Sequence, residues 1–253
     1  MPRLIRSGEP PDISSDMKTF LIYGDTGCGK TYALKTLPES MRPALMLDFD
    51  RGSRELNKDP SWGTFVQFDV TDPKGKPVMF DQTKSFLEEL AQNKDKDVVD
   101  LNEIRTIVVD SITTLVKAAQ DRTLQYFIDN GRGGNSRSDR NTPPTQAEYG
   151  MVAHIVEGLI RGIIGLNKNL IVIAHEASKV QDEVTGLSVA GPALQRSLAV
   201  SLPRYFDEVI FAKAEGKEPN RTYVWNTRAS GMFVARSRHD LDAKIPQDFG
   251  AYA

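Results

Sequence analysis

The chain has 253 residues, a formal net charge of −2 and a single cysteine. These values exclude a disulfide framework and a multi-cysteine metal site, and the ordinary share of charged and hydrophobic residues excludes a disordered chain. The longest apolar runs fall far below the roughly 20 residues that span a bilayer, and the first residues lack the apolar core of a signal peptide. We therefore expect a soluble, cytoplasmic protein with no membrane partner.

The expected elements alternate along the chain between short buried strands and helices. Residues 1–17, which contain Pro2, Pro10 and Pro11, are expected to form an irregular arm. Short, mostly apolar runs predict five strands of the kind found in parallel sheets, at 19–23, 44–47, 64–70, 106–109 and 170–174. Helical spacing or composition predicts helices between them, from 30 to near 38, and at 78–93, 112–128 and 147–166.

Two long polar stretches and a strand-rich tail complete the pattern. Residues 131–144 are rich in glycine, serine and asparagine and predict a mobile loop, and 177–203 are polar with one helical piece. The tail predicts strands at 208–212, 221–225 and 232–235. Together these elements predict an α/β fold with a mainly parallel central sheet flanked by helices, and antiparallel strands at its C-terminal edge. The expected organisation is an arm at 1–17, one domain at 18–246 and a C-terminal tail at 247–253.

The strongest motif is the segment Gly24-Asp25-Thr26-Gly27-Cys28-Gly29-Lys30-Thr31, which fits the pattern G-x-x-x-x-G-K-[ST] without a mismatch. Residue frequencies give a chance match in about 1% of chains of this length. A buried strand precedes the motif and a helix follows it, so its backbone N–H groups can surround a phosphate chain. Lys30 would reach the β- and γ-phosphates and Thr31 would bind Mg²⁺, so the expected ligands are ATP and Mg²⁺.

Polar side chains follow three other expected strands, at the edge of the sheet where such a phosphate loop lies. Asp110 ends an apolar strand and could hold the Mg²⁺; alone, it would be an ordinary exposed strand-end aspartate. Asp50, two residues after Asp48, could polarise a water for attack on the γ-phosphate or instead cap a helix. His175 and Glu176 could sense the γ-phosphate or form a satisfied strand-end pair.

These features resemble the RecA-like ATPases, and the whole arrangement is similar to the small phage ATPases of the Sak type, which serve single-strand annealing or recombination. The resemblance lies in Thr106–Ser111, Leu170–Glu176, Pro192–Leu194 and Leu202–Ile210, and it covers about residues 18–246. It implies a RecA-like ATPase domain that works as a filament or ring. It also implies phage-type recombination in the host cytoplasm if the protein is phage-encoded.

The resemblance assigns further catalytic roles. Lys30 would bind phosphate, and Asp50 would stand where the family usually has a glutamate that activates the water, with a side chain one methylene shorter. Glu176 falls where recombinases commonly have a glutamine that senses nucleotide. Arg236 and Arg238 fall where they have two basic residues that reach the γ-phosphate of a neighbouring subunit; alternatively, both are solvated arginines at a strand end.

The resemblance also implies a DNA partner. Recombinases hold DNA with two loops, which correspond here to 131–144 and 177–203. The first contains Arg132, Arg137 and Arg140, which would contact phosphates of single-stranded DNA; a solvated loop is the equally simple interpretation. A single-strand DNA-binding protein is a further possible partner.

Two other functions stay open. The shorter Asp50 is compatible with a nucleotide-binding regulator or loader of a replication protein that hydrolyses little ATP. A small-molecule P-loop kinase would need a lid with clustered arginines, for which 131–144 is the only candidate.

Overall fold

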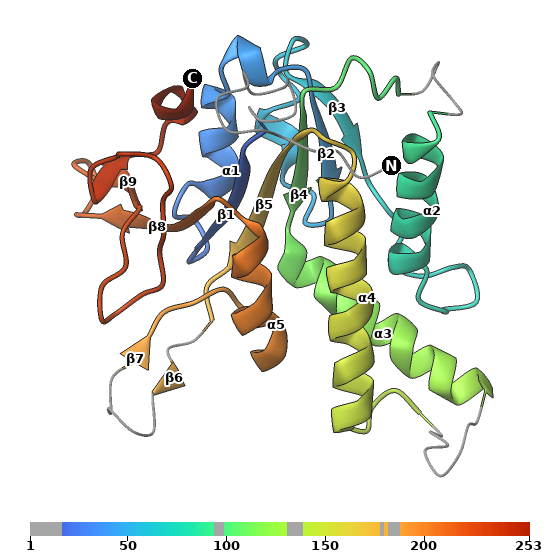
Figure 1. Cartoon of the computed structure of the whole chain (residues 1–253). Coiled ribbons are helices and arrows are strands. Elements are labelled where there is room, and N and C mark those ends of the chain that lie inside the picture. Colours follow the sequence, from blue (N-terminus) through green and yellow to red (C-terminus); the bar gives the residue numbers. More distant parts are fainter. Residues whose placement is uncertain (1–16, 94–98, 131–138, 178–179, 182–187) are drawn as a thin grey trace, which may run out of the picture.

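The computed structural model describes residues 17–93, 99–130, 139–177, 180–181 and 188–253. Within them, the centre of the protein is an eight-stranded sheet with the order β10-β9-β8-β1-β5-β4-β2-β3 (Figure 1). In chain order its strands are β1 (Thr19–Gly24), β2 (Ala44–Asp48), β3 (Gly63–Val66), β4 (Thr106–Asp110), β5 (Asn169–His175), β8 (Glu208–Glu215), β9 (Thr222–Asn226) and β10 (Lys244–Pro246). Two short strands, β6 (Val180–Gln181) and β7 (Ser188–Val189), pair with each other outside it.

The six strands from β8 to β3 are parallel, and β9 and β10 add antiparallel pairs at the C-terminal edge. This confirms the expected α/β fold with a mainly parallel sheet and antiparallel strands at its C-terminal edge. The helices are α1 (Lys30–Ala33), α2 (Met79–Ala91), α3 (Ile112–Asn130), α4 (Gln146–Ile164) and α5 (Arg196–Ser201).

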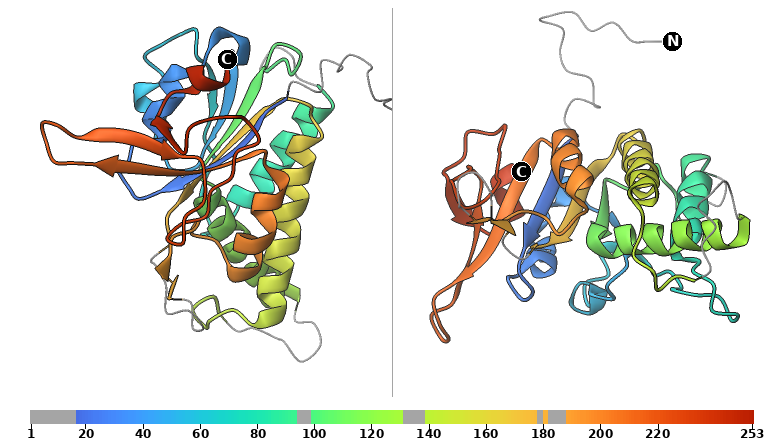
Figure 2. Two further views of the ribbon diagram at one scale, coloured as in Figure 1. Left: turned by 60° about the vertical axis from the view of Figure 1, so that its left-hand side comes forward. Right: turned by 90° about the horizontal axis from the view of Figure 1, so that it is seen from below.

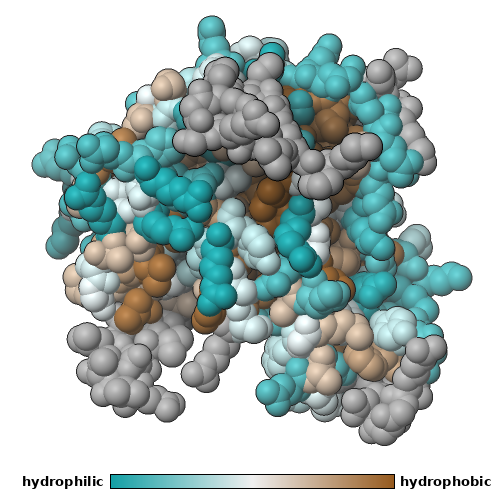
Figure 3. Space-filling view, viewed as in Figure 1, coloured by the Kyte–Doolittle hydropathy of each residue, from teal (hydrophilic) through white to brown (hydrophobic). Residues whose placement is uncertain are grey.

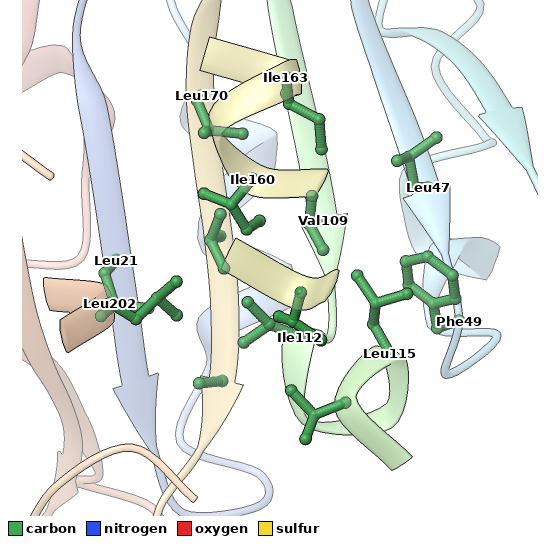
Figure 4. Close-up of a cluster of buried hydrophobic side chains, with 14 of the residues drawn as sticks. Leu21, Leu47, Phe49, Val109, Ile112, Leu115, Ile160, Ile163, Leu170 and Leu202 are labelled. Atoms are coloured by element: carbon green, nitrogen blue, oxygen red, sulfur yellow. The ribbon is translucent and has the colours of Figure 1, made fainter. Parts of the chain in front are cut away.

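The strands bury both faces of the sheet, because alternate side chains point to opposite sides. On one face, Leu21 and Leu47 belong to a core cluster with α3 and α4, where Ile112 and Ile160 pack (Figure 4). On the other face, Ile22 and its alternating partners pack with α1 and the end of the chain. Helices α2 to α5 therefore cover one face and α1 the other, which Figure 2 shows from two sides.

Helix α4 begins with a capping box. The Thr145 hydroxyl accepts a hydrogen bond from the Glu148 N–H, and the Glu148 carboxylate accepts one from the Thr145 N–H. This exchange satisfies two N–H groups that would otherwise lack partners at the start of the helix. It fixes where the chain turns from the 139–145 segment into the helix that covers β4 and β5.

The C-terminal part of the chain differs from the expectation in two ways. Residues 232–235 form no strand; Phe233 makes only isolated bridges, and β10 at Lys244–Pro246 takes the edge position instead. Residues 247–253, expected as a tail after the domain, pack onto it. Phe249 and Tyr252 are buried against Phe20 and Trp225, on the same face of the sheet as the short helix α1.

Hydrophilic residues cover much of the face that Figure 3 shows, with brown surface in hollows and small patches. Among the described residues, no helix is both long enough and apolar enough to span a membrane.

The packing of the C-terminal segment can be tested by truncating one ring. Phe249→Ala should lower the free energy of unfolding by about 3–5 kcal/mol, the usual cost of removing a buried aromatic side chain. Thermal and urea unfolding measure it, with Tyr149→Ala as the control, since Tyr149 is 38% exposed. Equal stability of the two variants would show that 247–253 is a separate tail.

Candidate nucleotide site

The phosphate loop lies between β1 and α1, as expected from its sequence. Gly29 has φ +93°, in the left-handed region that favours glycine. Gly24 is needed for a different reason: a Cβ there would lie 2.2 Å from the Ala212 carbonyl oxygen of β8. The Lys30 side chain is buried, and its Nζ donates hydrogen bonds of 2.8 Å to the carbonyl oxygens of Gly24 and Asp25. The lysine is thereby held within the loop, where a phosphate would bind.

Thr31 and Asp110 are in direct contact. The Thr31 hydroxyl donates a hydrogen bond of 2.6 Å to Asp110 Oδ2. Thr31 lies on α1, which follows β1, and Asp110 ends β4, so this contact connects two segments whose strands are separated by β5. Asp110 is 3% exposed. The pKa of its carboxyl is raised to about 6, chiefly by burial; the Thr31 hydrogen bond and the Lys30 charge lower it, and the charges of Asp50 and Asp48 raise it.

This pair fits Mg²⁺. A hydroxyl and a carboxylate are the hard oxygen ligands that Mg²⁺ takes, and a cation beside Asp110 would offset the desolvation of its buried negative charge. Among the described residues no group of three or more metal-ligating side chains occurs. Mg²⁺ is commonly held by one or two protein ligands together with phosphate oxygens.

The two aspartates after β2 have different surroundings. The Asp48 carboxylate accepts hydrogen bonds from the backbone N–H groups of Gly52 and Ser53 and from the side chain of Gln67, so it shapes the turn. Asp50 instead lines the pocket that contains Lys30, Thr31 and Asp110. Its Oδ1 accepts a hydrogen bond from the Thr114 hydroxyl, and its Oδ2 lies 3.1 Å from His175 Nε2. Asp50 is therefore the carboxylate of the two that faces the space for a reacting water.

His175 and Glu176 lie on opposite sides of the phosphate loop. His175 lines the same pocket as Asp50 and Asp110. Glu176 lines a second hollow, behind the loop, with Asp25, Cys28 and Phe211. Of the two residues expected at this edge, His175 lies at the end of the pocket that contains Lys30 and Asp110, and Glu176, to which the resemblance assigns the sensing role, does not.

The pocket has a volume of about 900 Å³ and extends well beyond the phosphate loop. Its far part is lined by residues that the sequence did not indicate, Tyr32, Thr36, Tyr223, Pro246, Gln247 and Asp248. Gln247 fixes this wall to the loop, because its Nε2 donates hydrogen bonds of 2.8 Å to the Cys28 carbonyl and 3.2 Å to the Val224 carbonyl. Tyr32 is 64% exposed and Tyr223 is 41% exposed, so both rings have accessible surface. Lys35 lies 4.4 Å from the centre of the Tyr32 ring, and Arg221 lies 5.9 Å from the centre of the Tyr223 ring.

The side chain of Cys28 lies beneath the phosphate loop and is not exposed on its open face. It is 2% exposed, and its Sγ lies 3.7 Å from Lys30 Nζ. Burial raises the pKa of the thiol, and the Lys30 charge lowers it. The side chain therefore fills space beneath the loop.

The expected trans-acting arginines lie away from this pocket. Arg236 pairs with Val209 near the beginning of β8, and its guanidinium donates to the carbonyls of Pro203, at 3.0 Å, and Phe206. Arg238 forms an ion pair of 2.7 Å with Asp207. Since β8 is parallel to β1, both arginines lie toward the end of the sheet opposite the phosphate loop. A role at a nucleotide would require the nucleotide of another subunit.

Of the expected DNA-contacting residues, the structure describes one. Arg140 is exposed and donates a hydrogen bond of 3.2 Å to the Gly75 carbonyl. Arg132 and Arg137 lie outside the described residues.

The exposed ring of Tyr223 gives a prediction for the base end of the pocket. Tyr223→Ala should weaken ATP binding about 5- to 100-fold, the range expected when a base–aromatic stack is removed. It should leave the binding of inorganic tripolyphosphate unchanged, because that ligand has no base. Titration with a fluorescent ATP analogue, with competition by each ligand, measures both, and Tyr149→Ala is the control. An equal weakening for the two ligands would contradict a base contact.

The raised pKa of Asp110 gives a prediction for pH. Affinity for Mg·ATP should rise as the pH passes through about 6, since only the carboxylate binds the cation. Without ligand, the free energy of unfolding should decrease as the pH rises from about 4 to 6, because in this range the folded state retains a proton that the unfolded state has released. Calorimetric titration from about pH 5 to 7.5 measures the affinity, and thermal unfolding from about pH 3.5 to 7.5 measures the stability. Asp110→Asn should abolish this pH dependence; if it persists in that variant, another group causes it.

Comparison with known proteins agrees with this geometry. Among family models, the AAA domain matches residues 16–239. No curated protein matches the chain. Among solved structures, a KaiC-like protein from the hyperthermophilic archaeon Pyrococcus horikoshii OT3 is 16% identical, with a TM-score of 0.46 and coverage of 90% of this chain and 84% of that one. Since the matched family model spans most of its length, the chain belongs to the AAA domain family of P-loop ATPases.

Proposed function

We propose that this protein is a RecA-like ATPase that binds single-stranded DNA and assists homologous recombination or strand annealing of the phage type. The observation that carries the ATPase part is the hydrogen bond between Thr31 and Asp110 beside the buried Lys30. Three side chains thereby place a cation, a hydroxyl and a carboxylate around one loop of backbone N–H groups. These groups are the ones that bind Mg²⁺ and the phosphates of ATP in P-loop ATPases.

The residues have distinct tasks in this proposal. Lys30 exchanges its bonds to the loop carbonyls for the β- and γ-phosphates. Thr31 and Asp110 hold Mg²⁺, which when bound neutralises the charge on those phosphates. Asp50 accepts a hydrogen bond from the attacking water and orients it toward the γ-phosphate.

The DNA part of the proposal rests on sequence and charge. The 131–144 segment contains three arginines. It is therefore a local concentration of positive charge in a chain whose net charge is −2. Such a patch suits weak contacts that add up over many assembled copies. Assembly as a filament or ring would also explain arginines 236 and 238, which lie far from the pocket of their own chain. A single-strand DNA-binding protein is a further proposed partner.

The hydrolytic function can be tested by removing the lysine. The wild type should hydrolyse ATP slowly and faster with single-stranded DNA, and Lys30→Ala should abolish both rates because the variant no longer binds the phosphates. Lys117→Ala is the control, since Lys117 lies exposed on α3 in an ion pair with Asp121. Phosphate release with and without DNA measures turnover, and size-exclusion chromatography in both states measures assembly.

The outcome separates the alternatives. ATP binding without turnover would favour the regulator or loader, with which the short side chain of Asp50 is compatible. Phosphorylation of a small acceptor, with no response to DNA, would instead favour a kinase.

The DNA contact has its own test. A variant with Arg132, Arg137 and Arg140 changed to alanine should bind a labelled oligonucleotide more weakly, and its affinity should depend less on salt. In a plot of the logarithm of the binding constant against the logarithm of the salt concentration, the magnitude of the slope should decrease by up to about 0.7 for each DNA phosphate that the variant no longer neutralises. Fluorescence anisotropy at several salt concentrations measures this. Equal binding by both proteins would remove the 131–144 segment from the interface.

A further inference from the structure

Asp50 is held from two sides by side chains of two other elements. Its Oδ1 accepts the hydrogen bond of Thr114, which lies on α3, and its Oδ2 lies 3.1 Å from Nε2 of His175, at the end of β5. An ionised carboxylate can only accept hydrogen bonds, so the contact with the ring requires the proton on Nε2. Both oxygens of Asp50 are therefore fixed, and each retains a lone pair for a further donor such as water.

His175 is itself fixed by its backbone. Its N–H donates a hydrogen bond of 3.1 Å to the Thr113 hydroxyl, and its carbonyl accepts one of 2.7 Å from the Ala193 N–H. Its position along β5 is set by the parallel pairing with β1, in which it lies opposite Gly24 of the phosphate loop. The imidazole is thus attached to the rigid sheet at the level of the phosphate loop.

We propose that His175 is a positioning residue for Asp50, which rests on the proposed role of Asp50 in hydrolysis. A short carboxylate on the loop after β2 would otherwise rotate about its own side-chain bonds. A misplacement of about 1 Å in a reacting group can lower the rate about a hundredfold, so a carboxylate fixed in position should support faster hydrolysis than one that rotates freely. The Nε2–H of His175 holds Asp50 in the orientation that accepts the hydrogen bond of the attacking water.

The neighbouring Glu176 is not suited to this task. Consecutive residues of a strand point to opposite sides, and Glu176 lines the hollow behind the phosphate loop. Of the two polar residues at the end of β5, His175 is the one that contacts the pocket carboxylate.

ATP hydrolysis by the full-length protein, measured in a double-mutant cycle, tests the assignment. His175→Ala should lower kcat about tenfold or more, the scale of a hydrogen bond to a charged group, with KM for ATP changed less than about twofold, because ground-state binding is untouched. His175→Gln retains an N–H donor and should recover part of the rate. In the Asp50→Asn background, His175→Ala should cause no further decrease, since its partner is already altered.

A matched control separates a local effect from a general one. His154→Ala changes a histidine on the exposed side of α4, in the hollow beside α2, and should keep wild-type kinetics. Thermal unfolding should show the His175 variants folded, because the His175 side chain is 39% exposed.

Several results would overturn the proposal. Rate decreases that multiply in the double variant would show that His175 acts independently of Asp50, for instance on the phosphate itself. A raised KM with unchanged kcat, or His175→Ala behaving like His154→Ala, would remove the positioning role alone. A wild type that binds ATP but never hydrolyses it would overturn the proposed function, and this role with it.

Discussion

The buried carboxylate of Asp110 is the interaction on which the rest of the site depends. Taking a charge out of water is costly, and the hydroxyl of Thr31 offsets only part of that cost, as the raised pKa shows. Two further aspartates nearby add to the cost rather than relieve it. Lys30 offsets part of this cost, and a further cation beside Asp110 would offset more, so the site favours the binding of a positive charge.

The parallel sheet explains how separate segments meet there. In the observed register, Gly24 lies opposite His175, and Asp48 lies opposite Asp110. Four strands thus end at nearly the same level, and the phosphate loop, Asp50, Asp110 and His175 meet at the same edge. The close packing beneath, with alternate residues of every strand buried on opposite faces, keeps these ends from shifting relative to one another.

Much of this could be predicted from the sequence, and the failures have physical causes. Apolar runs and the glycine-rich motif identify the inner strands and the phosphate loop, because both are dictated by local composition. The edge strand Lys244–Pro246 was missed because it is short and mostly exposed, so no apolar run marks it. Tyr223 and Gln247 reach the pocket only through the pairing of β9 and β10, which pattern alone does not specify. The choice between His175 and Glu176 depends on which side of the sheet each faces.

The amide of Gln247 joins the phosphate loop to a segment 219 residues further along the chain. Occupancy of the pocket and the integrity of the last strand are therefore thermodynamically linked, because a ligand that contacts both stabilises the state in which they are docked. Local opening of residues 244–253 would weaken nucleotide binding without any change at the loop itself. Conversely, bound nucleotide should slow hydrogen exchange at the amides of β10, far from the phosphate loop in sequence, before it affects the inner strands.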